Sequence, residues 1–529
     1  MYDLILRNAR IIDGKGQGSF DGDIAISNGV IREIAPGIDA SAARELFLDG
    51  KIAAPGFIDI HTHSELSPFA QRKRPLSKLF QGVTTEIVGN CGISSYPLND
   101  RFYQEICDFY YSTVPGAAEQ LPLTDYNTEQ YAAHVIRSAP RINYGALIGH
   151  GTLRGAVMGF GMEEPTEDQL RQMEAVLDRE LSMGAFGMSL GLIYPPSSFS
   201  RQEELTALAR VLRHHDAILA VHLRNEGPHV FEALGEMLEI ARLSGVRLQI
   251  SHFKLMGKQQ WGRSGELLAV VERARREGVA VTCDQYPYAA SSTGLSALAP
   301  GWAHDGGVHA LVKRMQPPSQ KLLDDIETEM ERRGGADCVM VVSTHGVRRD
   351  AEGKTLAQLA AEHGTTARQQ AAQLLAECGG TVNCIYFSMD QNDVHTIMRD
   401  LNIAVASDGC SYDYDEQTRG NRLHPRNFGT FPRFFQTVRE QKLLTPEQAV
   451  YKVSGLPAKI LGLSDRGVLE VGKIADLTVF DWEEITDCCT FLDPVARPKG
   501  ILHVLVKGIP VLENGAETGY CPGTMLLHR

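Results

Sequence analysis

The chain has 529 residues, of which 43% are hydrophobic and 22% are charged, and its formal net charge is -13 at pH 7. These ordinary globular values exclude a disordered, collagen-like or coiled-coil chain. The negative charge and the lack of a long Lys or Arg block argue against a general nucleic-acid binder, because such affinity comes from neutralised phosphates. An anionic small-molecule substrate stays open, since a local pocket can oppose the global charge.

The first residues and the cysteines indicate a cellular location. Asp3 and Arg7 interrupt the N-terminus, and no apolar run of the signal-peptide type follows. No stretch reaches the roughly 18 apolar residues that span a bilayer. The ten cysteines are scattered without a CxxC pair, which in a chain of this size is typical of reduced thiols. We therefore expect a cytoplasmic protein with no membrane partner.

The two ends of the chain share a β-strand pattern. Residues 1–54 contain short strand-like runs broken by Gly or Asp, and similar runs return at 467–481 and 501–515. We expect residues 1–54 and 455–529 to form one small β-sandwich domain.

The middle of the chain, residues 55–454, alternates apolar strand-like runs with segments of helical period about eight times. Residues 163–184 and 229–245 are two of the predicted helices. This alternation predicts an α/β fold with a parallel sheet closed into a TIM-like (β/α)8 barrel. Residues 292–340 break the rhythm and are predicted to be an insertion over the barrel mouth, where barrels keep their active sites.

Two histidines follow the first apolar run of this region, PGFID. Residues i and i+2 of a strand point to the same face, so His61 and His63 can aim at one point, as a metal site requires. Cys91 follows the next apolar run, within VGNCGIS. A free cysteine is commonly a small buried hydrophobe, but its thiolate is also a good zinc ligand.

Three further polar residues end apolar strands: His222, His252 and Asp408. Either histidine alone could be a buried, hydrogen-bonded core residue, but both occupy equivalent positions in successive β-α units. A carboxylate at the end of a buried strand is costly unless it binds a cation or a network. Nitrogen, oxygen and sulfur donors together favour zinc over magnesium or calcium.

These motifs give the chain a resemblance to the amidohydrolase superfamily and, within it, to the N-acyl-D-amino-acid deacylases (D-aminoacylases). PGFIDIHTH indicates the superfamily, while GNCGIS, GHGTLR and HPRNFGTFPR are much more specific. The similarity extends over essentially the whole chain. Many superfamily members carry a carboxylated lysine on the fourth strand, but the matching stretch here, AFGMSLGL, has no lysine.

The resemblance implies roles for particular residues. The tightly bound zinc would be held by Cys91, His222 and His252. A second, weaker metal position would be formed by His61, His63 and Asp408, with Cys91 able to bridge. Asp408 would act as general base and acid. The substrate carboxylate would be gripped by Lys254, Tyr286 and Arg426.

The function implied is zinc-dependent hydrolysis of the amide bond of a small N-acyl-D-amino acid, giving a carboxylate and a D-amino acid. An alternative is a cyclic-amide hydrolase similar to hydantoinase or dihydropyrimidinase, against which the missing lysine argues. A third hypothesis is a non-catalytic scaffold of the same fold. The preferred side chain and acyl group, the number of metals and the oligomeric state stay open.

Overall fold

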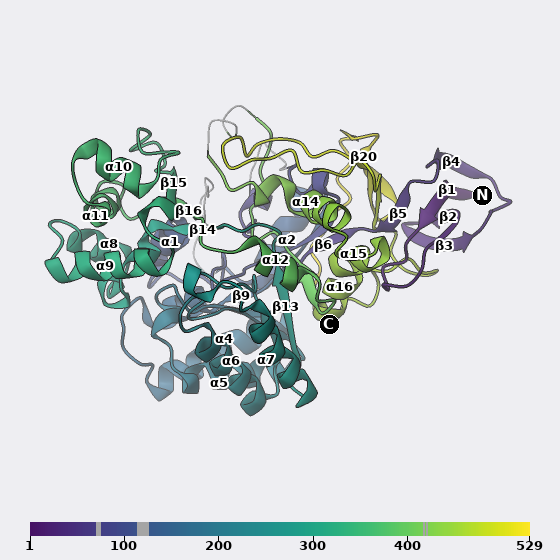
Figure 1. Ribbon diagram of the computed structural model, residues 1–529. Helices are drawn as coiled ribbons and strands as arrows, with labels where there is room; N and C mark the ends of the chain where they lie inside the picture. Colours follow the sequence, from purple (N-terminus) through teal and green to yellow (C-terminus); the bar gives the residue numbers. More distant parts are fainter. Residues whose placement is uncertain (70–75, 114–125, 416–417, 419–421, 529) are drawn as a thin grey trace.

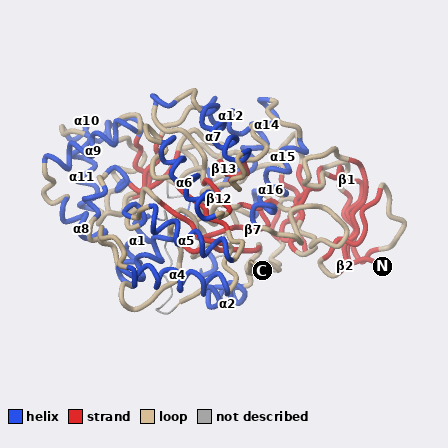
Figure 2. Tube along the Cα trace, turned by 90° about the horizontal axis from the view of Figure 1, so that it is seen from below, coloured by secondary structure: helices blue, strands red, loops and turns tan. Residues whose placement is uncertain are grey.

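The computed structural model describes residues 1–69, 76–113, 126–415, 418 and 422–528. Figure 1 shows an elongated molecule with strands from the N-terminus at one end and helices α8 to α11 at the other. Parallel strands and their covering helices lie between these ends (Figure 2). Among the helices of these ranges, none has both the length and the apolar character that a membrane crossing requires.

Strands from both ends of the chain form one nine-stranded sheet. Its N-terminal strands are β1 (Tyr2–Ile11), β2 (Phe20–Ser27), β3 (Val30–Ala35), β4 (Ala42–Phe47) and β5 (Ile52–Pro55). Its C-terminal strands are β18 (Leu477–Phe480), β19 (Ile501–Val506), β20 (Ile509–Glu513) and β21 (Ala516–Glu517). The junction is β5, which pairs parallel with β1 and antiparallel with β18.

The central part of the fold is built on parallel strands in two sheets. One sheet contains β6 (Phe57–Asp59), β7 (Val83–Val88) and β8 (Asn143–Ala146). The other contains β9 (Ile148–Gly149), β10 (Gly187–Gly191), β11 (Ile218–His222), β12 (Arg247–Ile250), β13 (Val281–Gln285) and β17 (Ile403–Val405). All these strands are almost completely buried, as expected where helices cover a parallel sheet.

Backbone hydrogen bonds link the edges of the two sheets. The N–H of Phe186, directly before β10, donates to the carbonyl of Ala146, the last residue of β8, at 2.9 Å. At the other edges, the N–H of Asp408, after β17, donates to the carbonyl of His61, after β6, also at 2.9 Å. The strands therefore follow one another in a circular order, and the segments after β6 and β17 lie side by side.

Helices separate and cover these strands. Their bounds are α1 (Tyr103–Thr113), α2 (Thr128–Ser138), α3 (His150–Met158), α4 (Glu167–Ser182), α5 (Gln202–His214), α6 (Val230–Ser244), α7 (Ser264–Arg276), α12 (Gln391–Met398), α14 (Arg426–Gln441), α15 (Pro446–Val453) and α16 (Gly455–Leu461).

Two of these helices confirm the helical segments predicted from periodicity. A capping box starts α4, because the Thr166 side chain accepts from the N–H of Gln169 while the Gln169 side chain accepts in return. The apolar stripe of α6 is buried as its spacing predicts, at Val230, Leu234, Met237, Leu238 and Ala241.

Residues 291–386 form a separate layer with its own hydrophobic cluster. Its antiparallel sheet contains β14 (Ser291–Gly294), β15 (Val339–Ser343) and β16 (Asn383–Tyr386), and its helices are α8 (Gly307–Arg314), α9 (Gln320–Arg332), α10 (Leu356–His363) and α11 (Ala367–Glu377). The first residue of β14 pairs with the last residue of β16, so the chain enters and leaves this layer at neighbouring positions. We call residues 291–386 the insertion; it contains the predicted segment 292–340 and continues past it.

Candidate metal centre

The predicted ligands all lie at or just after the carboxyl ends of parallel strands. His61 and His63 come after β6, Cys91 after β7, His222 ends β11, His252 follows β12 and Asp408 follows β17. Three of them, Cys91, His252 and Asp408, have positive φ values of 53°, 36° and 51°. Non-glycine residues rarely adopt this left-handed region, which costs of order 1–3 kcal/mol each and is concentrated at functional sites. The backbone therefore bends sharply at these three ligands.

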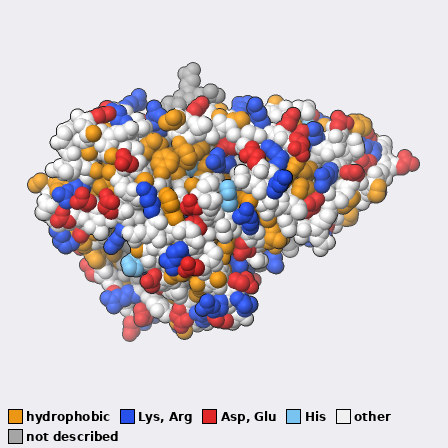
Figure 3. Space-filling model, in the orientation of Figure 1, with side chains coloured by type: hydrophobic (Ala, Val, Ile, Leu, Met, Phe, Trp, Pro, Cys, Tyr) orange, Lys and Arg blue, Asp and Glu red, His pale blue; other side chains and the backbone are white. Residues whose placement is uncertain are grey.

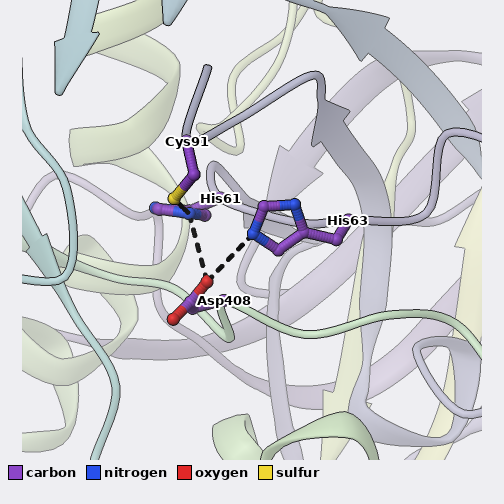
Figure 4. Close-up of side chains that lie close together, drawn as sticks. All are labelled: His61, His63, Cys91 and Asp408. Atoms are coloured by element: carbon purple, nitrogen blue, oxygen red, sulfur yellow. Dashed lines mark hydrogen bonds and ion pairs between the residues drawn. The ribbon is translucent and has the colours of Figure 1, made fainter. Parts of the chain in front are cut away.

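One ligand group gathers around Asp408 (Figure 4). The Asp408 Oδ1 atom lies 3.1 Å from His63 Nε2 and 3.3 Å from His61 Nε2. Cys91 Sγ lies 3.3 Å from the same His61 nitrogen. All four side chains offer a ligand atom within 4.8 Å of the others.

Cys91 also belongs to a second group, with His222 and His252. Its Sγ atom lies 3.5 Å from His252 Nε2, which in turn lies 3.0 Å from His222 Nδ1. In a tetrahedral zinc site with bonds of about 2.0 to 2.3 Å, neighbouring ligand atoms are about 3.3 to 3.8 Å apart. The distance from Cys91 Sγ to His252 Nε2 falls within this range, and the two ring nitrogens are slightly closer together. Two ring nitrogens and a sulfur gathered in this way form a donor set suited to zinc, and the position of Cys91 allows it to serve both groups.

Charges around the ligands favour their metal-binding forms. Burial opposes ionisation of the Cys91 thiol, but His61 and His252 outweigh it and hold the pKa of this thiol well below its usual range. Burial would likewise raise the pKa of Asp408, yet Arg426, His61 and His252 hold it well below its usual value. Thiolate and carboxylate are the forms that bind metals.

Two carboxylates that the sequence analysis missed support the histidines. Asp284, in β13, accepts from the backbone N–H of His252 at 2.7 Å, and its Oδ1 lies 3.4 Å from His61 Nδ1. Glu226 lies 3.0 Å from His252 Nδ1 and 3.5 Å from His222 Nε2. Carboxylates on the far ring nitrogen orient a metal-binding histidine. Asp284 lies near the end of a predicted strand, within DQYPY, and this position was a usable signal, whereas Glu226 lies four residues past the end of β11 and had none.

The fourth strand takes part through a serine. In β10, the Ser189 hydroxyl accepts from the N–H of Gly92 at 2.9 Å and donates to the carbonyl of Gly89 at 2.5 Å. These contacts hold the loop that carries Cys91. The strand that would carry a lysine in many superfamily members therefore positions the cysteine here.

The three predicted carboxylate-binding residues line a cavity of about 500 Å³ together with every predicted metal ligand except His61. The Arg426 guanidinium lies 5.3 Å from the centre of the Tyr286 ring, and Lys254 Nζ lies 5.7 Å from it. Arg426 pairs with Asp408 at 2.6 Å, and Lys254 pairs with Glu226 at 2.5 Å. Within the described part of the chain, the buried Tyr286 hydroxyl has no hydrogen-bond partner.

Relatives of the chain were found by sequence. A model of the amidohydrolase family matches residues 48–512. The chain is 35% identical to an N-acyl-D-glutamate deacylase of Alcaligenes xylosoxydans xylosoxydans, over 99% of this chain and 96% of the relative. It is 32% identical to a D-aminoacylase of the same organism, over 99% of this chain and 97% of the relative.

Solved structures agree with these relatives. An N-acyl-D-glutamate deacylase from Bordetella bronchiseptica, complexed with zinc and a phosphonate inhibitor, matches with a TM-score of 0.81 and 32% identity over 100% of both chains. A D-aminoacylase matches with a TM-score of 0.82 and 32% identity, again over 100% of both chains. A D-hydantoinase, at 17% identity and a TM-score of 0.56, shares the fold alone. The predicted fold is confirmed, and the chain belongs to the amidohydrolase family, in the group of the N-acyl-D-amino-acid deacylases.

Proposed function

We propose that the protein hydrolyses the amide bond of linear N-acyl-D-amino acids in a zinc-dependent reaction, releasing a carboxylate and a D-amino acid. The observation that carries this proposal is the juxtaposition of two metal-ligand groups, joined by Cys91, with Arg426, Lys254 and Tyr286 in one cavity. The relatives named as N-acyl-D-glutamate deacylase and D-aminoacylase support the same reaction.

In this proposal, two sets of residues hold the metal. Cys91, His222 and His252 form the tight site. His61, His63 and Asp408 form a second, weaker one. The chemistry that zinc supplies when bound is Lewis acidity, which lowers the pKa of water from 15.7 to about 7 and polarises the amide carbonyl.

Asp408 moves the proton. Its Oδ1 atom faces His61 and His63, and its Oδ2 atom accepts from Arg426 at 2.6 Å. The carboxylate takes a proton from the attacking water and then returns it to the departing amine nitrogen, as a general base followed by a general acid. Arg426 keeps this carboxylate ionised until the proton arrives.

The substrate carboxylate would contact Arg426, Lys254 and Tyr286. Arg426 can bind it with two parallel hydrogen bonds, and the Tyr286 hydroxyl, buried without a partner in the described ranges, can donate another. This grip would fix the amide near the metal ligands, because both groups line the same cavity.

The same features oppose a non-catalytic scaffold, since such a protein has no need for six gathered ligands. A cytoplasmic location is also part of the proposal, and it is supported by the cysteines, none of which forms a disulfide within the described residues. Lys, Arg, Asp and Glu are mixed on the face in Figure 3, without a basic patch there, which agrees with a small-molecule substrate.

The test measures amine release from the D and L forms of N-acetylmethionine and N-acetylglutamate, together with the zinc content of the purified chain. We expect release from D forms only, loss of activity after chelation, and recovery when zinc is restored. Release from L forms alone, or full activity in a chain without metal, would overturn the proposal.

A further inference from the structure

The insertion supplies one wall of this cavity, and that wall carries a cation in addition to Lys254 and Arg426. Arg333 follows α9 and lines the cavity together with Arg426 and Lys254. Only 6% of Arg333 is exposed. A buried guanidinium is costly unless it is paired and hydrogen-bonded. The reaction proposed above gives Arg333 no role.

Contacts from behind hold Arg333 in place. Its Nε atom donates to Glu329 at 2.9 Å, its Nη2 atom donates to the Ala297 carbonyl at 3.4 Å, and the guanidinium lies 5.1 Å from the centre of the Tyr386 ring. Among the residues the structure describes, none accepts a hydrogen bond from Nη1. Glu329 does not line the cavity, so Arg333 is fixed by the insertion while presenting a positive charge to the cavity.

Arg426 and Arg333 contact one continuous segment of the insertion, the first within β14 and the second just after it. Arg426 Nη2 donates to the carbonyl of Ser292 within β14, whereas Arg333 contacts Ala297, three residues after β14 ends. The wall between them is polar, because Thr293 shares a 2.7 Å hydrogen bond with the Tyr194 hydroxyl. Two separated guanidinium groups on one polar wall match a substrate with two carboxylates.

The other two cations that line the cavity pair with carboxylates that also line it, whereas Glu329, the partner of Arg333, does not. Glu226 pairs with Lys254, and Asp408 pairs with Arg426 and faces the metal-binding histidines. Arg333 is therefore the cation that lines the cavity without an acidic partner lining it. An apolar substrate side chain packed against Arg333 would remove water from the guanidinium without replacing the lost hydrogen bonds.

We infer that the preferred substrates are N-acyl-D-amino acids with an acidic side chain, N-acyl-D-glutamate or N-acyl-D-aspartate, whose side-chain carboxylate binds Arg333. This inference rests on the proposed function. The α-carboxylate takes Arg426, and the second carboxylate takes the guanidinium farther along the wall. Arg333 is then a specificity-determining residue and has no part in the chemical step.

The experiment compares kcat/KM for the N-acetyl derivatives of D-glutamate, D-aspartate, D-glutamine and D-methionine in the wild type and in Arg333→Met. D-Glutamine has the size of D-glutamate without its charge. We expect the wild type to prefer the acidic substrates over D-glutamine at least tenfold. Arg333→Met should lower kcat/KM for the preferred acidic substrate by about 10- to 150-fold, the range for a hydrogen bond to a charged group, and should leave D-glutamine and D-methionine within about threefold.

Arg332→Met is the matched control. Arg332 is the neighbouring residue, also contacts Glu329, at 3.5 Å, and has 48% of its side chain exposed, so its loss should leave the ranking of substrates unchanged. Arg333→Lys keeps the charge and should keep the preference for acidic substrates. Thermal melting of all variants shows whether each one folds.

Three outcomes would overturn the inference. They are a wild type that prefers D-methionine over both acidic substrates, an equal loss on all four substrates in Arg333→Met, and a ranking that Arg332→Met changes as much. Turnover with the wrong preference leaves the proposed function standing. No turnover of any of the four would overturn the proposed function, and the inference with it.

Discussion

The cavity has two walls of different origin. The proposed metal ligands lie at the ends of buried parallel strands, where neighbouring strands and carboxylates such as Asp284 and Glu226 fix them. Another wall comes from the insertion, which packs around a hydrophobic cluster of its own. The difference indicates a division of work, in which the strands supply the chemistry and the insertion supplies the fit to the substrate side chain.

The largest expected effect is the loss of metal from the cavity wall that the strand ends form. His222→Ala and Cys91→Ala each remove a donor from the group proposed to bind metal tightly. Catalytic zinc sites typically have three protein ligands, so zinc content should fall below about a tenth of an ion per chain and activity should disappear. Metal analysis of the purified variants measures this. His214→Ala, on the exposed end of α5, is the control and should keep both metal and activity. A His222→Ala variant with full zinc would contradict the assignment.

The next effect separates metal binding from proton transfer. Asp408→Asn leaves Cys91, His222 and His252 in place, so the tight metal should stay bound while kcat falls by about 100- to 10,000-fold, the contribution of a general acid-base residue. Zinc content and kcat are measured on the same preparation. Asp168→Asn, on exposed α4, should change neither. Full turnover in Asp408→Asn would remove this residue from the mechanism.

The smallest effect on the chemistry is expected from the insertion. Leu359, in α10, is fully buried in the insertion cluster, and Leu359→Ala should destabilise this layer by about 2–5 kcal/mol through lost burial and a cavity. Denaturant unfolding measures the change, and zinc content should stay normal because the ligands lie outside the insertion. Leu243→Ala, at a position 49% exposed in α6, should have little effect. Loss of metal in Leu359→Ala would show that the two walls are not independent.

Sequence patterns predicted the strand wall well because its signals are local. An apolar run followed by a histidine, cysteine or aspartate is visible without knowing which strands are neighbours, and the buried stripe of α6 follows directly from helical spacing. Glu226 and Arg333 could not be found in this way. Their importance depends on what they face, which is Lys254 and the histidines for one and the cavity for the other.

The way the insertion is attached has an evolutionary consequence. Because Ser291 pairs with Tyr386, its two points of attachment are neighbours on one small sheet. Residues can be gained, lost or exchanged between them without shifting the register of the strands that carry the ligands. Related enzymes could therefore change their substrate preference while keeping the same set of proposed metal ligands.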